Sequence, residues 1–184
     1  GFKLLVVTGG IAKGRKLKLP DRKVTRPTSQ IVRESIFAII NNLQPDFFQV
    51  IDLYAGSGML GIEALSRGAE HCIFVESNRS VSRLIRTNLL TTSLLNKSKI
   101  INASVGKWKL VTKDVSTLIL ADPPFNDELK WINIEKSLGD LSFHKKVLLV
   151  IEHFHKDDAP KKNSGLKLYQ SRRHGDSIIS FYKN

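Results

Sequence analysis

Apolar stretches that alternate with helical segments constrain the fold of this chain more than any other feature of its sequence. From residue 48 to residue 153, short runs rich in Val, Ile and Leu alternate with longer amphipathic stretches. We expect strands at 48–55, 71–76, 97–104, 116–125 and 145–153, and helices at 58–69, 78–95 and 128–141. This order predicts an α/β fold in which a mostly parallel sheet is covered by helices on both faces.

The two ends of the chain depart from this alternation. Residues 166–173 and 177–183 predict a C-terminal antiparallel hairpin around a turn at 174–176. Residues 3–10 and 15–20 predict a small N-terminal hairpin, and a helix is expected from Thr28 or Ser29 to Asn41 and Asn42. We therefore expect a hairpin extension over 1–27 and one globular domain over 28–184.

The net charge indicates the class of partner. The 184 residues carry 29 Lys and Arg against 17 Asp and Glu, a formal net charge of +12. Because such a domain attracts polyphosphates by Coulomb steering and counterion release, nucleic acid is the expected partner, although a basic surface can also serve solubility alone. The N-terminal bases include the RNA-binding candidates Lys13, Arg15, Lys16 and Arg26; a second group is Lys161, Lys162, Lys167, Arg172 and Arg173.

Other classes of protein are excluded or disfavoured. The longest apolar runs fall far below the roughly 20 residues that a membrane span needs. The single cysteine, Cys72, excludes an internal disulfide and a multi-cysteine zinc site, and its apolar surroundings predict a buried thiol. With no secretory signal pattern at the start of the sequence, we expect a cytoplasmic protein, and a monomer.

A glycine loop follows the first strand of the alternating region. Residues 56–61 match G-x-G-x-x-G, in which Gly56, Ser57 and Gly58 can bring the backbone close to a nucleotide at a helix N-terminus. Asp52 lies in the preceding strand, with Tyr54 between it and the loop. An acid there repels a pyrophosphate but suits the cationic groups of S-adenosylmethionine.

A second acid ends the next strand. Glu76, which Ser77 follows, stands where a carboxylate can accept the two hydroxyls of a ribose. The alternative is structural: Asp52 and Glu76 cap helices, and the glycines permit tight turns. We interpret both acids, Tyr54 and Ser77 as candidate cofactor ligands, together with Asp122 at the end of the fourth predicted strand.

The fourth strand is predicted to end in Asp122, Pro123, Pro124 and Phe125. The switch point of such a sheet places this segment beside the glycine loop. The prolines fix the backbone and keep carbonyl groups out of helical hydrogen bonding. The Asp122 carboxylate and these carbonyls can grip an exocyclic base amine, direct its lone pair toward an electrophile and accept its proton, while Phe125 stacks on the base. The alternative is an Asp N-cap before a proline-started helix.

The sequence resembles the bacterial ribosomal RNA small-subunit methyltransferase D family. The resemblance covers nearly the whole chain, through "KGRKLKLP", "RPTSQIVRESIF", "DLYAGSGMLGIEALSRGA", "FVE", "DPPF" and "GDSIISFY". It implies a class I methyltransferase fold, S-adenosylmethionine as cofactor, and methylation of the exocyclic N2 amine of a guanine in 16S ribosomal RNA or the small ribosomal subunit.

The resemblance also assigns residues. It implies that Asp52, Gly56, Ser57, Gly58 and Glu76 contact the cofactor, that Thr28 lines its methionine end, and that Asp122, Pro123, Pro124 and Phe125 hold guanine. Many methyltransferases have an acid after the third strand to bind adenine, whereas this chain has Asn102, whose oxygen can accept the same hydrogen bond. Arg26 and Arg33 are candidates either for RNA contacts or for ion pairs with acids such as Glu34.

Three alternatives stay open. The same four residues could hold adenine N6 or cytosine N4 of another RNA or of DNA, although a DNA enzyme usually adds a target-recognition domain. An NAD(P)-dependent oxidoreductase fits the glycine loop but leaves the Asp-Pro-Pro-Phe segment and the basic charge unexplained. A ribosome-assembly RNA binder without activity would bind RNA but transfer no methyl group.

Overall fold

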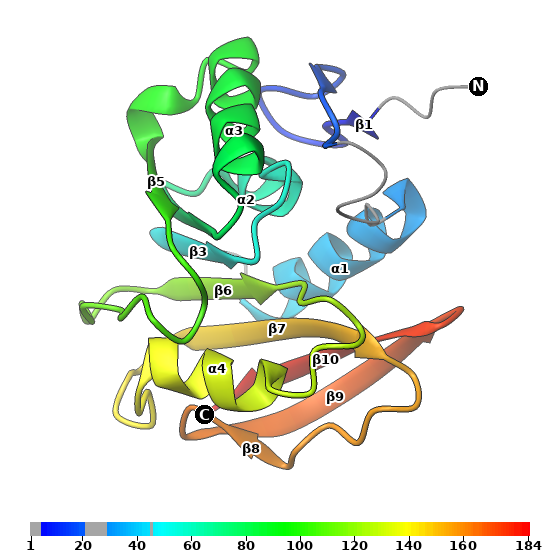
Figure 1. The fold of residues 1–184 in the computed structure, drawn as a ribbon, viewed down its shortest axis with the longest axis vertical. Helices are drawn as coiled ribbons and strands as arrows, with labels where there is room; N and C mark the ends of the chain where they lie inside the picture. The colour runs from blue at the N-terminus through cyan, green and yellow to red at the C-terminus, as the bar shows by residue number, and fades with distance from the viewer. Residues whose placement is uncertain (1–4, 21–28, 45) are drawn as a thin grey trace.

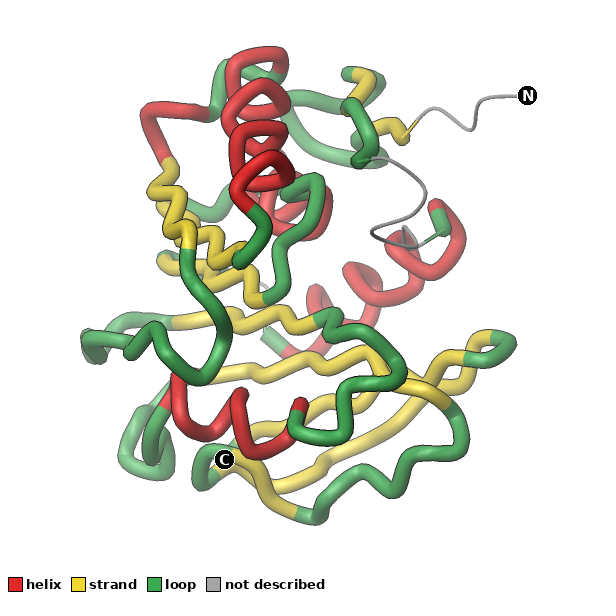
Figure 2. Tube along the Cα trace, in the orientation of Figure 1, coloured by secondary structure: helices red, strands yellow, loops and turns green. Residues whose placement is uncertain are grey.

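One mixed sheet organises the chain. The structure, a computed structural model, describes residues 5–20, 29–44 and 46–184. The elements are β1 (Leu5–Val6), β2 (Lys16–Leu17), α1 (Gln30–Leu43), β3 (Gln49–Leu53), α2 (Met59–Ser66), β4 (His71–Glu76), α3 (Arg79–Thr91), a short 3-10 helix (Leu95–Lys97), β5 (Ser98–Asn102), β6 (Thr117–Ala121), α4 (Lys130–Leu138), β7 (Val147–Phe154), β8 (Lys162–Asn163), β9 (Leu166–His174) and β10 (Ser177–Lys183). Figures 1 and 2 show their arrangement.

The sheet has the order β5-β4-β3-β6-β7-β10-β9-β8. Strands β3 to β7 are parallel, and β10 pairs antiparallel with both β7 and β9. The expected fold class, a mostly parallel sheet with a C-terminal antiparallel hairpin, is confirmed. The chain moves outward from β3 to β5 and then returns to β6 on the other side of β3, so the carboxyl ends of β3 and β6 flank the switch point.

Helices cover both faces, because successive strand residues point to opposite sides. Val50 and Leu120 belong to the core cluster shared with α1, α2 and α3, whereas Ile51 and Ile119 belong to the cluster shared with α4. In Figure 1, α4 lies in front of the sheet and α1 behind it. Among the described residues, no helix is long and apolar enough to cross a membrane.

The N-terminal hairpin, formed by β1 and β2, packs against the end of α2. Gly10 has a φ of 78°, and a Cβ there would come within 1.8 Å of the Ser66 carbonyl oxygen. Ile11 donates its backbone N–H to that carbonyl at 2.8 Å. Because Leu5 and Leu17 are buried in the core cluster of α1 to α3, the hairpin shares the core of the main domain.

Several boundaries differ from the prediction. Helix α1 continues one residue past Asn42 to Leu43, and its N-cap is Ser29, whose side chain accepts the Val32 N–H at 3.3 Å. Strand β6 ends at Ala121, before the Asp-Pro-Pro-Phe segment, because the ladder with β3 and β7 also ends there. Strand β8 was not predicted. A two-residue edge strand is too short to produce a periodic sequence pattern.

Candidate active site

The glycine loop connects β3 to α2 at the switch point. Gly58 is the N-cap of α2 in the left-handed conformation, with a φ of 80°. Gly61 serves packing, because a Cβ there would lie 2.4 Å from Phe74 and 2.8 Å from the Cys72 sulfur. The third glycine of the motif therefore allows α2 to lie against β4. Cys72 is fully buried, as expected.

Asp52 lies inside β3, on the face that α2 covers. Its Oδ2 accepts the Gly61 N–H at 3.0 Å, and the residue is 2% exposed. Burial, and secondarily the nearby Glu76 carboxylate, raise the pKa of Asp52 to about 8 despite that hydrogen bond. The side chain thus stabilises the first turn of α2, which is the helix-capping role given above as the structural alternative. Because its pKa is raised, the carboxyl group is mostly protonated at neutral pH unless a cation lies near it.

Glu76 ties two loops together at the end of β4. Its Oε1 accepts the Gly56 N–H at 3.0 Å and its Oε2 accepts the Asn78 N–H at 2.7 Å. A carboxylate offers about four acceptor positions, so two are left for a ligand. Glu76 therefore fixes the glycine loop and can still accept hydroxyl groups.

A pocket of about 250 Å³ opens beside these loops. This volume lies just below the roughly 300–1,000 Å³ that is typical of small-molecule sites. Glu76, Ser77 and Tyr54 line it, together with Pro124 of the Asp-Pro-Pro-Phe segment. The Tyr54 hydroxyl is buried and has no hydrogen-bond partner among the described residues. Burial, and then Asp127, raise the pKa of Tyr54, so its hydroxyl stays a donor.

The sequence did not predict the other five residues of this pocket. They are Val75, Ser104, Val105, Asp127 and Asn133. Ser104 and Val105 follow β5 at the carboxyl edge, so the strand pattern could have indicated them. Asn133 comes from α4, and only the tertiary packing places it there.

Of the predicted cofactor ligands that the structure describes, six do not line this pocket: Asp52, Gly56, Ser57, Gly58, Asn102 and Asp122. Ser57 is buried, and its carbonyl accepts a hydrogen bond from Asn88 at 2.8 Å. Asn102 donates its amide group to the carbonyls of Glu76 at 3.0 Å and Ser77 at 2.9 Å. Its Oδ1 is then the atom that can accept a hydrogen bond from a ligand.

The Asp-Pro-Pro-Phe segment lies beside the glycine loop. Ala121 pairs with Leu53, so the next residues, Asp122 and Tyr54, leave the sheet side by side. The Pro124 carbonyl, which we expected to face a substrate, accepts the Asp127 N–H at 3.1 Å and closes a turn. The acceptors proposed for an amine are therefore reduced to the Asp122 carboxylate and the Pro123 carbonyl.

Two contacts hold Phe125. Its ring lies 5.5 Å from that of Phe154, centroid to centroid, at an interplanar angle of 34°. Its carbonyl accepts a hydrogen bond from the Lys130 ammonium at 3.0 Å, and this buried ammonium also pairs with Asp157. Sequence reasoning missed Lys130, because one lysine at the start of a helix gives no signal of burial.

The predicted RNA contacts have different outcomes. Lys13, Arg15 and Lys16 are exposed on the N-terminal hairpin, whereas Arg26 and Thr28 lie outside the described residues. Arg33 is only 2% exposed. Its Nη1 donates to the Val6 carbonyl at 2.7 Å and lies 3.9 Å from Glu63, so Arg33 is a structural residue.

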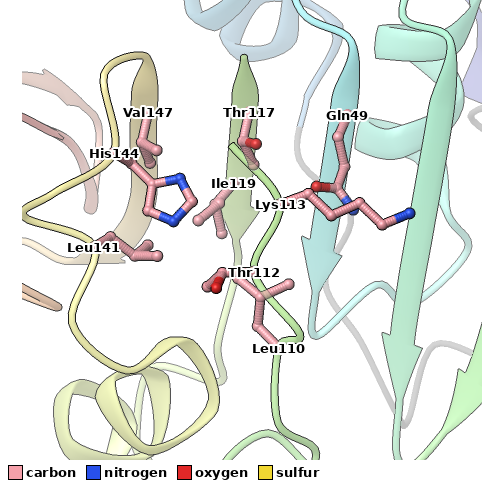
Figure 3. A pocket seen from close by; sticks show the side chains of 9 residues that line it. All are labelled: Gln49, Leu110, Thr112, Lys113, Thr117, Ile119, Leu141, His144 and Val147. Atoms are coloured by element: carbon pink, nitrogen blue, oxygen red, sulfur yellow. The ribbon is translucent and has the colours of Figure 1, made fainter. Parts of the chain in front are cut away.

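The pocket in Figure 3 lies at the amino ends of the parallel strands, opposite the candidate active site. Gln49, Thr117 and Val147, the first residues of β3, β6 and β7, line it with His144 and Lys113. Its volume is about 10 Å³, enough for about one water molecule. Across 5–20, 29–44 and 46–184, no cluster of His, Cys, Asp and Glu could hold a metal.

Comparison with known proteins agrees with this geometry. A family model described as "Conserved hypothetical protein 95" matches residues 5–183. The chain is 32% identical over 185 residues to YlbH of Bacillus subtilis (strain 168), provisionally named an rRNA methyltransferase, and the match covers 96% of this chain and 97% of that one. It is 30% identical over 179 residues to Ribosomal RNA small subunit methyltransferase D of Escherichia coli (strain K12), covering 96% and 88%.

Solved structures agree as well. The structure of yhhF from Escherichia coli, provisionally described as a methyltransferase, matches with a TM-score of 0.77 at 26% identity and covers 97% of this chain and 96% of that one. Both the sequence and the fold thus match over almost the full length given. The chain therefore belongs to this family of methyltransferases, which contains the ribosomal RNA small-subunit methyltransferase D proteins.

Proposed function

We propose that this protein methylates the exocyclic N2 amine of a guanine in 16S ribosomal RNA, with S-adenosylmethionine as methyl donor. The observation that carries the proposal is the placement of the Asp-Pro-Pro-Phe segment: Asp122 follows a strand directly beside β3, and Pro124 lines the same pocket as Glu76. The guanine assignment rests on the family resemblance, and the ribosomal substrate on the named Escherichia coli relative.

The pocket and the loops beside it have donors and acceptors that suit the cofactor. Glu76 can accept ribose hydroxyls, the Tyr54 hydroxyl offers an unused donor, and Asn102 Oδ1 can accept from an adenine amine. A Cβ at Gly56 would meet nothing within 4 Å, so the loop leaves open space for a ligand. Asp52 would ionise when a cationic group approaches, which favours S-adenosylmethionine over a pyrophosphate-containing cofactor.

When bound, S-adenosylmethionine supplies an electrophilic methyl group on a sulfonium. The Asp122 carboxylate and the Pro123 carbonyl would accept hydrogen bonds from the two N–H groups of the guanine amine. These bonds would orient the lone pair of the amine nitrogen toward that methyl group. Transfer of the methyl group to the amine nitrogen would break the S–C bond of the cofactor, and Asp122 or water would accept the surplus proton. Phe125, supported by Phe154 and Lys130, would fix the plane of the base.

The test supplies labelled S-adenosylmethionine and unmethylated small-subunit particles, followed by nucleoside analysis. The parent protein should form N2-methylguanosine, and Asp122→Ala should lower the rate by at least about 100-fold, the lower end for a group acting in acid–base catalysis. Asp176→Ala, which removes an exposed acid in the β9–β10 turn, is the matched control. Cofactor binding and thermal unfolding show whether each variant is folded.

The product distinguishes the alternatives. Label in methyladenosine or methylcytidine would keep the chemistry and refute the guanine assignment. RNA binding without any transfer, to particles or naked RNA, would refute the proposed activity in favour of an RNA-binding protein.

A further inference from the structure

One long segment of the chain contains basic residues but no acidic residues. Residues 77–113 include eight Lys and Arg residues and no Asp or Glu. Helix α3 and β5 belong to this segment. A surface without counter-charges keeps its positive potential, so this part of the molecule is a candidate for binding a polyanion.

Helix α3 carries three of these basic residues on one face. Arg79, Arg83 and Arg86 are spaced by four and three residues, and all three are exposed. Such positions lie above one another on a helix, whereas Val81 and Ile85 are buried on the face toward the sheet. None of the three arginines forms an ion pair with another described residue.

The N-terminal hairpin packs against another flank of α3. Asn88 of α3 accepts the Lys18 N–H at 2.8 Å and donates to the Lys18 carbonyl at 3.0 Å. These two bonds hold β2, with the exposed Lys16, against α3. Figure 1 shows the hairpin and α3 on the same side of the molecule. Because Asn88 lies nine residues after Arg79, about half a turn round the helix, the hairpin covers the flank of α3 opposite the arginines and leaves the arginine face open to solvent.

This surface begins near the candidate active site. Helix α3 starts three residues after Glu76, and β4, β3 and β6 are successive strands of the sheet. Two strand spacings, about 10 Å, thus separate the end of β4 from the end of β6, where Asp122 follows. A nucleic acid that places a base at Asp122 can extend its neighbouring phosphates toward α3.

We propose that the arginine face of α3 (Arg79, Arg83 and Arg86) binds the phosphate backbone of the RNA that flanks the target nucleotide. This inference rests on the proposed function and adds a docking surface to it. Arginine suits the role because its planar guanidinium can bind a phosphate through two parallel hydrogen bonds.

The experiment measures the affinity for a labelled transcript of small-subunit ribosomal RNA as a function of salt concentration. The test protein carries Arg79→Gln, Arg83→Gln and Arg86→Gln. The control carries Lys136→Gln, Lys145→Gln and Lys146→Gln, which remove the same charge from exposed positions outside residues 77–113. Affinity for S-adenosylmethionine and thermal unfolding are measured on all three proteins.

The expected result is a shallower salt dependence for the arginine variant alone. Three lost phosphate contacts lower the slope of log K against log salt by about 2 to 3, and near 0.15 M salt they weaken binding by about 10- to 100-fold. Cofactor affinity and melting temperature should not change. Equal slopes for the two variants would overturn the inference, even where the parent methylates RNA. A parent that binds RNA through these arginines but transfers no methyl would instead refute only the proposed activity.

Discussion

Replacing Asp52 with Asn should change how cofactor binding depends on pH. The Asn oxygen can still accept the Gly61 N–H that Asp52 accepts at 3.0 Å, so the first turn of α2 stays capped. Only the ionisable group is lost. Because burial raises the pKa of Asp52 to about 8, most ligand-free molecules carry a proton there at neutral pH.

The size of the effect follows from that pKa. A group with a pKa of about 8 is about 0.9 protonated at pH 7 and about 0.1 protonated at pH 9. If the bound cofactor places a cation near Asp52, the carboxyl must lose its proton on binding. The parent should then release up to about 0.9 more protons per cofactor than Asp52→Asn at pH 7, and almost none more at pH 9.

Stability should respond with a defined sign. The folded-state pKa is higher than that of the unfolded chain, so between about pH 4 and pH 8 the folded state binds more protons. The free energy of unfolding of the ligand-free parent should therefore fall as pH rises through this window, by at most on the order of 6 kcal/mol. Asp52→Asn should remove most of this dependence.

Titration calorimetry in buffers of different ionisation enthalpy measures the released protons. Ionisation of the cofactor itself is common to both proteins, so the difference between them isolates residue 52. Asp176→Asn serves as the control and should behave like the parent. Equal proton release by the parent and Asp52→Asn at pH 7 would refute the idea that Asp52 ionises against the cofactor.

Two further predictions concern packing around the site. Gly61→Ala should destabilise the protein by about 1 to 3 kcal/mol, because the new Cβ would lie 2.4 Å from Phe74; denaturant unfolding should show a smaller cost in a Phe74→Leu background, and equal costs in both backgrounds would contradict the contact. Lys130→Met should lower kcat while leaving cofactor affinity unchanged, since it frees the Phe125 carbonyl that the ammonium binds at 3.0 Å. The exposed Lys136→Met is its control, and a Lys130→Met enzyme with full kcat would show that Lys130 does not position Phe125.

Local patterns predicted the elements of this fold well. The alternation of apolar residues depends on neighbours a few positions apart, so it located β3 to β7 and the helices between them. The Asp-Pro-Pro-Phe segment was predicted as part of a strand, but β6 ends at Ala121. A strand ends where its partners end, and the sequence of one strand does not contain that information.

Charged residues were harder to assign. Arg33 was a candidate for RNA binding or an ion pair, and the structure buries it against Glu63, 30 positions away. Asp52 was predicted either to contact the cofactor or to cap a helix, and in the structure its carboxylate accepts the Gly61 N–H in the first turn of α2. Whether a charge binds a ligand or a neighbour depends on burial, and burial depends on contacts between distant parts of the chain.

By itself, the sequence determined the α/β architecture, the glycine loop and the position of the Asp-Pro-Pro-Phe segment, because these follow from local spacing and from the rules of parallel sheets. Only the tertiary structure decided that Lys130 pairs with Asp157 to hold Phe125, that the hairpin joins the main core, and that Asn88 fastens it to α3. These contacts link residues 27 and 70 positions apart, and each buried polar group needs a partner that no local sequence pattern brings to it.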